Sequence, residues 1–142
     1  MDITASNAII MLSVPGLFDI PQQLQQFSAE NVFGVDPLAA AETQMGVDGY
    51  LTGGVVFNPT NQSFELMADS PSNFFFDTLY LRQRADQVTY RIQGTVILTA
   101  VGTKYTMRRG ILTTWMPMPE AGRVLKARRH TITWERVTPN PT

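Results

Sequence analysis

The stretch VTYRIQGTVILTAVGTKYTMRRGILTTWMP, residues 88–117, decides the fold class. Apolar and β-branched residues alternate with polar ones along it, which is typical of strands with one buried face. Gly94, Gly102 and Gly110 interrupt the alternation, so the stretch predicts four strands rather than one. We expect these strands over residues 88–92, 95–101, 105–109 and 111–117.

The same periodicity continues on both sides of this stretch. It predicts further strands over residues 8–14, 17–20, 24–28, 39–47, 50–57, 63–68 and 128–137. Many short strands at nearly regular spacing indicate a β-sandwich or β-barrel. The expected fold is therefore mainly β, with two packed antiparallel sheets and one flanking α-helix, in a single domain that spans residues 1–142.

The helix is predicted after Ser70. Pro71 suits the first helical position, and Asp77 follows early in the helix, where the helix dipole favours an acidic side chain. The apolar residues that follow recur at helical spacing and predict a stripe that packs on the core. They are Phe75, Phe76, Leu79 and Tyr80.

Two other local signals concern a turn and the carboxyl-terminal tail. Asp48-Gly49 stands between two alternating segments and predicts a β-hairpin with a type I′ turn. Residues 137–142 contain Pro139 and Pro141, and we expect an extended tail that cannot pair fully in a sheet.

Composition bounds the class of protein. The chain has 142 residues, of which 44% are hydrophobic and 16% charged, with no cysteine and one histidine. The charged fraction is below the usual value of about 25%, which favours a surface partly buried against partners. The apolar run of residues 8–12 lacks a basic leader and is too short for export or membrane spanning, so neither is expected.

Charge is segregated along the chain. Residues 1–81 contain nine acids and no base, for a formal charge of −9, whereas residues 82–142 carry +8. Pairing of the two halves within the fold is the favoured outcome. If acidic and basic faces survive folding, they favour head-to-tail contacts between copies.

Residues suited to catalysis are scarce. His130 is the only histidine and has no orienting partner in its surroundings, so a half-exposed strand residue is the favoured interpretation. Glu42 and Asp48 do not form a recognisable carboxylate pair or metal loop, and no glycine motif matches a nucleotide loop. The basic residues between 123 and 136 could line a nucleic-acid groove, but pairing with the acidic half is favoured. We therefore expect no enzyme, no cofactor and no metal site.

Six segments, together with the aromatic helix, occur in an order that is typical of one family: ETQMGVDG (42–49), FNP (57–59), FELMADSPS (64–72), RRGILT (108–113), MPMP (116–119) and TITWE (131–135). In this order the chain resembles the tail tube proteins of contractile-tailed bacteriophages, which are related to the tubes of pyocins and type VI secretion. The resemblance covers nearly the whole chain.

The resemblance implies hexameric rings that share one inner β-barrel and stack into a hollow tube inside a contractile sheath. The expected partners are the tail sheath protein, baseplate and tail terminator proteins, and the tape measure protein and DNA that pass through the lumen; no membrane binding is implied. The chain is then part of the virion and is made in the host bacterial cytoplasm. Two alternatives stay open: a baseplate or tail-completion protein of the same fold, and a capsid decoration module.

Residue positions in such a tube can be assigned from the alternation of residues 41–47. A lumen that carries DNA must not bind phosphates, so acids and amides suit its wall better than Lys or Arg. We expect Glu42, Gln44 and Asp48 to face the lumen, with Thr43, Met45 and Val47 against the subunit core, although the opposite phase stays open.

Contacts between subunits are expected from extended segments that contain proline. These segments have few internal partners and gain order through contact with other copies. They are the amino-terminal segment, the loop with Asn31, Val35, Asp36 and Pro37, and the tail with Pro139 and Pro141. Deletion of residues 139–142 is expected to weaken polymerisation without unfolding the monomer.

Overall fold

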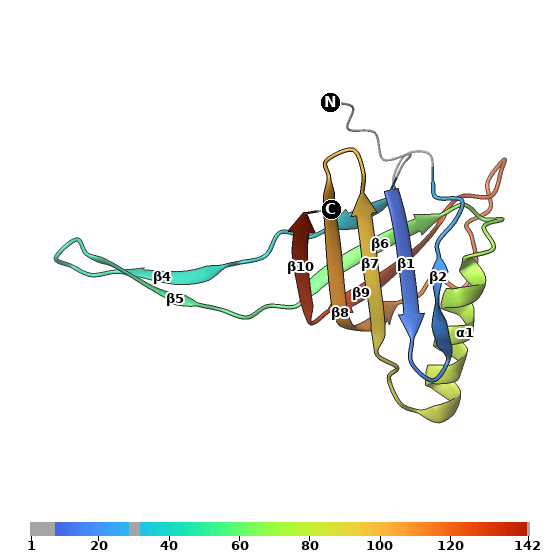
Figure 1. The fold of residues 1–142 in the computed structure, drawn as a ribbon, viewed down its shortest axis with the longest axis horizontal. Coiled ribbons are helices and arrows are strands. Elements are labelled where there is room, and N and C mark those ends of the chain that lie inside the picture. Colours follow the sequence, from blue (N-terminus) through green and yellow to red (C-terminus); the bar gives the residue numbers. More distant parts are fainter. Residues whose placement is uncertain (1–7, 29–31, 142) are drawn as a thin grey trace.

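The computed structural model describes residues 8–28 and 32–141 (Figure 1). Within these ranges the chain forms ten strands and one helix, which confirms the expected mainly β fold with a single helix. The elements are β1 (Ala8–Val14), β2 (Phe18–Gln23), β3 (Phe33–Val35), β4 (Ala41–Met45), β5 (Leu51–Val55), β6 (Thr60–Leu66), α1 (Asn73–Asp86), β7 (Ile92–Leu98), β8 (Thr103–Thr114), β9 (Arg128–Trp134) and β10 (Arg136–Pro141).

Eight strands join in one antiparallel sheet, and β4 and β5 form a separate two-stranded sheet. The large sheet folds into two layers, and the long strand β8 belongs to both of them. Its first half pairs with β7 and β10, whereas its second half, from Ile111 onward, pairs with β9. One layer therefore contains β2, β1, β7, β8 and β10, and the other contains β9, β6 and β3 behind it (Figure 1).

The glycines that suggested strand ends have another role. Strand β7 runs through Gly94 and β8 runs through Gly110, so the predicted breaks at these residues are wrong. A Cβ atom on Gly94 would lie 2.8 Å from the Trp134 ring, and one on Gly110 would lie closer to that ring still. Both glycines thus leave room for the buried indole of Trp134. Only Gly102, with φ of +68°, marks the turn that was expected of it.

Several predicted strand ends also shift. The predicted strand over residues 24–28 is absent: β2 ends at Gln23, and only a single bridge from Phe27 to Leu66 follows. The carboxyl-terminal residues form β10, which pairs with β8 from Arg136 to Pro141. The expectation that the tail cannot pair fully in a sheet is wrong. Strand β10 pairs only with β8, and Pro139 and Pro141 lie two residues apart, so the backbone nitrogens of both can face the unpaired edge, where no N–H is needed.

Helix α1 begins at Asn73, two residues later than predicted. Pro71 lies in the turn before it, where its carbonyl accepts a hydrogen bond from the backbone N–H of Phe74 at 3.2 Å. The first helical turn contains no acidic residue, so the dipole role expected of Asp77 is also wrong. The Asp77 carboxylate instead accepts hydrogen bonds from Arg128 of β9 and from the Trp115 indole.

The predicted apolar stripe of α1 is confirmed, since Phe75, Phe76 and Leu79 are buried. Phe76 stacks on His130 at 4.4 Å between ring centres and lies 6.3 Å from the ring of Phe64. The helix thereby closes the space between the layers at one side. Strands β3 and β10 lie at the opposite side, where the β4–β5 hairpin leaves the body (Figure 1).

Candidate functional site

The most unusual feature of the described structure is the β4–β5 hairpin, which extends far from the body (Figure 1). Every residue of both strands is exposed. The predicted hairpin is confirmed, but its loop has three residues, 47–49, closed by a hydrogen bond from Gly46 N–H to the Tyr50 carbonyl at 2.9 Å. Only Gly49 in this loop has a positive φ, +89°, so the predicted type I′ turn is wrong.

The register divides the hairpin into two chemically different faces. Met45 lies opposite Leu51, and Ala41 opposite Val55, so these four apolar residues share one face with Thr43. The other face carries the acidic and polar residues, because Glu42 lies opposite Gly54, and Gln44 opposite Thr52. The two faces are named here the apolar face and the polar face of the hairpin.

The apolar face has no cover within the described chain. Met45 is 62% exposed, Leu51 63% and Val55 76%. The expectation that Thr43, Met45 and Val47 pack against the subunit's own core is therefore wrong. The expected separation of Glu42 and Gln44 from Met45 onto opposite faces agrees with the register, whereas Asp48 lies in the loop.

Apolar exposure concentrates in this part of the chain. Of the seventeen large apolar side chains that are well exposed in the described residues, eight lie between residues 35 and 57. Single exposed apolar residues are normal on a protein surface, whereas a cluster of this size is typical of an interaction surface. The eight are Val35, Leu38, Met45, Val47, Tyr50, Leu51, Val55 and Phe57.

Within the described residues, the segments expected to lack internal partners do have them. They include the residues next to the hairpin stem, which is the pair of connections, residues 36–40 and 56–59, that join β4 and β5 to the body. Val35 pairs with Gln62 in the sheet, and Asp36 N–H donates to the Asn61 carbonyl at 3.2 Å; Pro37 follows in the exposed connection to β4. Together with the pairing of β10, these contacts contradict the premise that the segments lack internal partners. Asn31 lies outside the described residues.

Charges divide between the hairpin region and one face of the large sheet. Asp36, Glu42 and Asp48 have no ion-pair partner among the described residues. The same holds, in the ranges 8–28 and 32–141, for three exposed bases that share the outer face of β8 and β10. These bases are Lys104, Arg108 and Arg136. The sequence segregation thus leaves an acidic arm and a basic face in the folded chain.

Part of the charge segregation is cancelled inside the fold, as predicted. Arg129 pairs with Glu65 at 3.5 Å, and Arg128 pairs with Asp77 at 2.6 Å, joining the basic and acidic halves. The Arg128 guanidinium is 7% exposed and also donates to the Met116 carbonyl, while Asp77 accepts from the Trp115 indole at 2.8 Å. This cluster fixes α1 to β9, and its residues gave no motif in the sequence.

His130 belongs to the same cluster and is completely buried, so the expected half-exposed position is wrong. Its Nδ1 accepts from the Met116 N–H at 3.4 Å, which leaves Nε2–H to donate to Asn73 Oδ1 at 3.2 Å. Burial, and secondarily the nearby Arg128, lowers the pKa of His130 to about 4, against a raising contribution from Asp77. A buried imidazole with both nitrogens engaged serves packing, not acid-base chemistry.

The described residues contain no group of three or more side chains suited to hold a metal ion. In the same part of the chain, no helix has both the length and the apolar character needed to cross a bilayer.

Solved structures share this fold. A chain from the sheath-tube complex of an extracellular contractile injection system, PVC, in its extended state has a TM-score of 0.66 at 13% identity, covering 99% of this chain and 93% of that one. A chain from the PVC sheath/tube terminator has a TM-score of 0.68 at 14% identity, covering 99% and 97%. A chain from the anti-feeding prophage baseplate has a TM-score of 0.61 at 11% identity, covering 99% and 97%.

These likenesses confirm the fold that the resemblance to tail tube proteins implied. No curated protein matches the sequence. The family model described as tail fiber protein gp32 matches residues 1–138, nearly the full length. The chain therefore belongs to the tail fiber protein gp32 family, a family of structural tail proteins and not of enzymes.

Proposed function

We propose that this chain is the repeating subunit of a contractile-tail tube, in which hexameric rings stack and their β4–β5 hairpins line a common channel. The observation that carries the proposal is an amphipathic hairpin whose apolar face nothing in the described chain covers. A two-stranded hairpin alone is marginally stable in water, so an arm of this kind gains its stability from neighbouring copies.

The energy of covering the apolar face favours a closed ring over an isolated pair. Full burial of a Leu, Val or Met side chain stabilises by about 1.5–3 kcal/mol, so Met45, Leu51 and Val55, already partly covered, contribute on the order of 3–6 kcal/mol per hairpin. Association costs about 4–15 kcal/mol in lost freedom of motion. One hairpin contact is therefore marginal. In a ring, every subunit both supplies a hairpin and receives one, and closure leaves no hairpin uncovered.

The polar face suits the wall of a DNA conduit. Glu42, Gln44 and Thr52 on this face carry no positive charge, and residues 1–81 contain no Lys or Arg. A wall without bases does not hold phosphates by counterion release, so DNA slides past it. We place Glu42 and Gln44 toward the lumen, with Asp48 at the rim formed by the hairpin loops.

Contacts between copies are proposed along the edge strands. Val35, Asp36 and Pro37 adjoin the hairpin stem, and Pro139 and Pro141 lie on the edge strand β10. Opposite charge on the hairpin arm and on the outer face of β8 and β10 steers copies into a head-to-tail arrangement. Asn31 is proposed as a further contact from its position in the sequence before β3.

The wider partners follow from the same role. In a contractile tail, the outside of the tube meets the sheath protein and its ends meet baseplate and terminator proteins, while the tape measure protein and DNA occupy the lumen. The PVC sheath-tube complex contains a chain of this fold, which supports the proposal. The protein would then reside in the virion after synthesis in the host bacterial cytoplasm.

A second role is favoured by the other structures of the same fold. They come from a sheath/tube terminator, a baseplate and a tube-terminating cap. A terminator or baseplate protein uses the fold at one level of the particle instead of repeating it along the tube. The distinguishing property is open-ended stacking of rings.

Negative-stain microscopy of the purified chain tests the proposal. Hollow tubes or six-fold rings are expected, and a persistent monomer at high concentration would favour the accessory role. Met45→Asp on the apolar face should abolish rings and leave a folded monomer with an unchanged circular dichroism spectrum, whereas Gln44→Asp on the polar face of the same strand should still assemble. A tube reconstruction with Glu42 on the outer surface would overturn the lumen assignment.

A further inference from the structure

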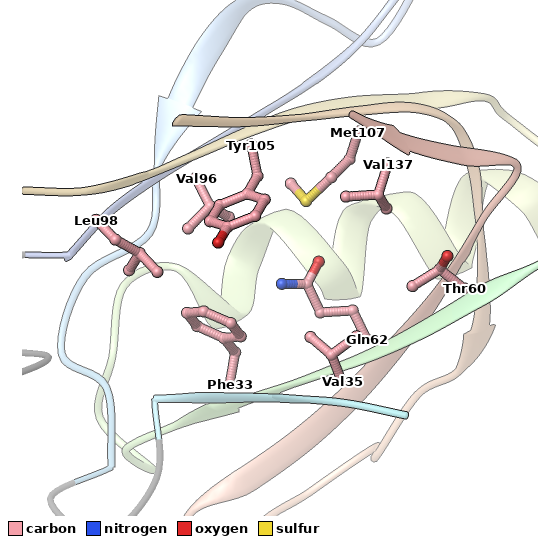
Figure 2. Close-up of a pocket in the computed structure, with 9 residues that line it drawn as sticks. All are labelled: Phe33, Val35, Thr60, Gln62, Val96, Leu98, Tyr105, Met107 and Val137. Carbon is pink, nitrogen blue, oxygen red and sulfur yellow. The ribbon is translucent and has the colours of Figure 1, made fainter. Parts of the chain in front are cut away.

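An apolar cavity of about 290 Å³ lies between the two layers, at the side away from the helix (Figure 2). Its walls come from both layers: β7, β8 and β10 on one side, and β3 and β6 on the other. The cavity is nearly twice as large as engineered cavities of about 150 Å³ that bind small apolar molecules. Its lining residues are Phe33, Val35, Thr60, Gln62, Val96, Leu98, Tyr105, Met107 and Val137.

One polar side chain, that of Gln62, faces into this cavity. Gln62 is 3% exposed, and its Oε1 accepts a hydrogen bond from Trp134 Nε1 at 2.9 Å. Its amide nitrogen points into the cavity between Phe33 and Tyr105 (Figure 2). A side-chain amide donor that faces otherwise apolar walls suits an apolar group that brings a carbonyl oxygen.

The cavity is lined from opposite layers by two strands that do not pair with each other, through Val35 of β3 and Val137 of β10. A surface groove along the hairpin stem, lined by Leu38 and Phe57 among others, shares Thr60 and Val137 with the cavity. The cavity thus adjoins the groove along the hairpin stem.

We infer that this cavity receives an apolar side chain from the β4–β5 hairpin of a second copy, with a backbone carbonyl of that hairpin accepting from Gln62 Nε2. The inference rests on the proposed assembly. A second copy is favoured over a small molecule because the cavity shares lining residues with the groove along the hairpin stem and because the uncovered apolar face of the hairpin supplies the side chains. The chain's own hairpin points away from the body (Figure 1), and no residue of β4 or β5 lines the cavity.

Cysteine cross-linking tests this contact, because the native chain contains no cysteine. Val96→Cys places a thiol in the cavity wall, and Val14→Cys places one at an equally buried site outside the cavity. Each variant is mixed with an equal amount of a hairpin variant, Met45→Cys, Leu51→Cys or Gln44→Cys, and then oxidised. The Cα atoms must come within about 7 Å for a disulfide to form. Leu98→Cys serves as a second cavity position if Val96→Cys does not fold.

The expected result is a disulfide-linked heterodimer from the cavity thiol with Met45→Cys or Leu51→Cys, at least tenfold above its yields with Gln44→Cys and with Val14→Cys as the buried partner. Microscopy of the native chain is run in parallel. Rings without this cross-link overturn the cavity contact and leave the tube role intact. Cross-linked pairs without rings support the cavity contact and overturn the tube role. Neither rings nor cross-link overturns both, and equal yields with Val14→Cys overturn the cavity contact.

Discussion

Acidification should destabilise this protein through one residue, His130. Both ring nitrogens are engaged in the neutral form, since Nδ1 accepts from Met116 N–H and Nε2–H donates to Asn73. A second proton on Nδ1 would meet the Met116 N–H, a donor facing a donor. Arg128 nearby adds further repulsion, and Asp77 offsets part of it.

The magnitude follows from the difference in pKa between the two states. The pKa of His130 is 6.5 in an unperturbed chain and about 4 in the folded protein. The unfolded chain therefore binds the proton first, so stability is intact above pH 6.5 and falls as the pH drops toward 4. At 1.36 kcal/mol per pKa unit, the full loss is about 3 kcal/mol, of which about 2 kcal/mol occurs between pH 7.5 and pH 5.

Urea denaturation at pH 7.5 and pH 5 measures this loss, and the monomeric variant Met45→Asp provides a background free of assembly. The loss of about 2 kcal/mol corresponds to a fall of about 6–8 °C in the melting temperature of a domain of this size. His130→Gln, which cannot take up a proton, should lose at least 1.5 kcal/mol less over the same interval (about three-quarters of that loss). Because the chain has no other histidine, equal losses in both proteins would refute the reasoning.

Two further substitutions test the packing of the sheet and the helix. Gly110→Ala places a methyl group against the Trp134 ring and should destabilise by about 1–3 kcal/mol, whereas Gly54→Ala, with open space around it, should leave the urea midpoint unchanged or higher. Asp77→Ala leaves the buried Arg128 guanidinium without its carboxylate; with Asp77 36% exposed, the expected loss is about 2–3 kcal/mol, below the roughly 3–5 kcal/mol of a fully buried pair. An unchanged urea midpoint for Asp77→Ala would show that water replaces the carboxylate.

Most errors of the sequence interpretation came from residues whose role depends on distant partners. Gly94 and Gly110 were interpreted as strand ends, yet they make room for Trp134, which follows at least 24 residues later in the chain. Asp77 was assigned to the helix dipole, yet it holds Arg128, 51 residues away. No local pattern distinguishes these roles, because the same residue types also suit turns and helix ends.

The candidate site was predictable in part. Asp48-Gly49 located the hairpin, and alternation along residues 41–47 placed Glu42 and Met45 on opposite faces, as the register has them. The cover of the apolar face was assigned to the subunit's own core, which the structure contradicts. Alternation tells which residues share a face but not what lies against it, so the open cavity beside Gln62 gave no signal either.

The sequence by itself determined the mainly β class, the position of the single helix and the amphipathic hairpin, because each depends on periodicity over neighbouring residues. Only the tertiary structure decided that β8 continues from one layer into the other, that β10 pairs along its whole length, and that the hairpin extends away from the core. These features depend on contacts between residues far apart in the chain. Such contacts are selected by packing and hydrogen bonding in three dimensions, which local propensity does not encode.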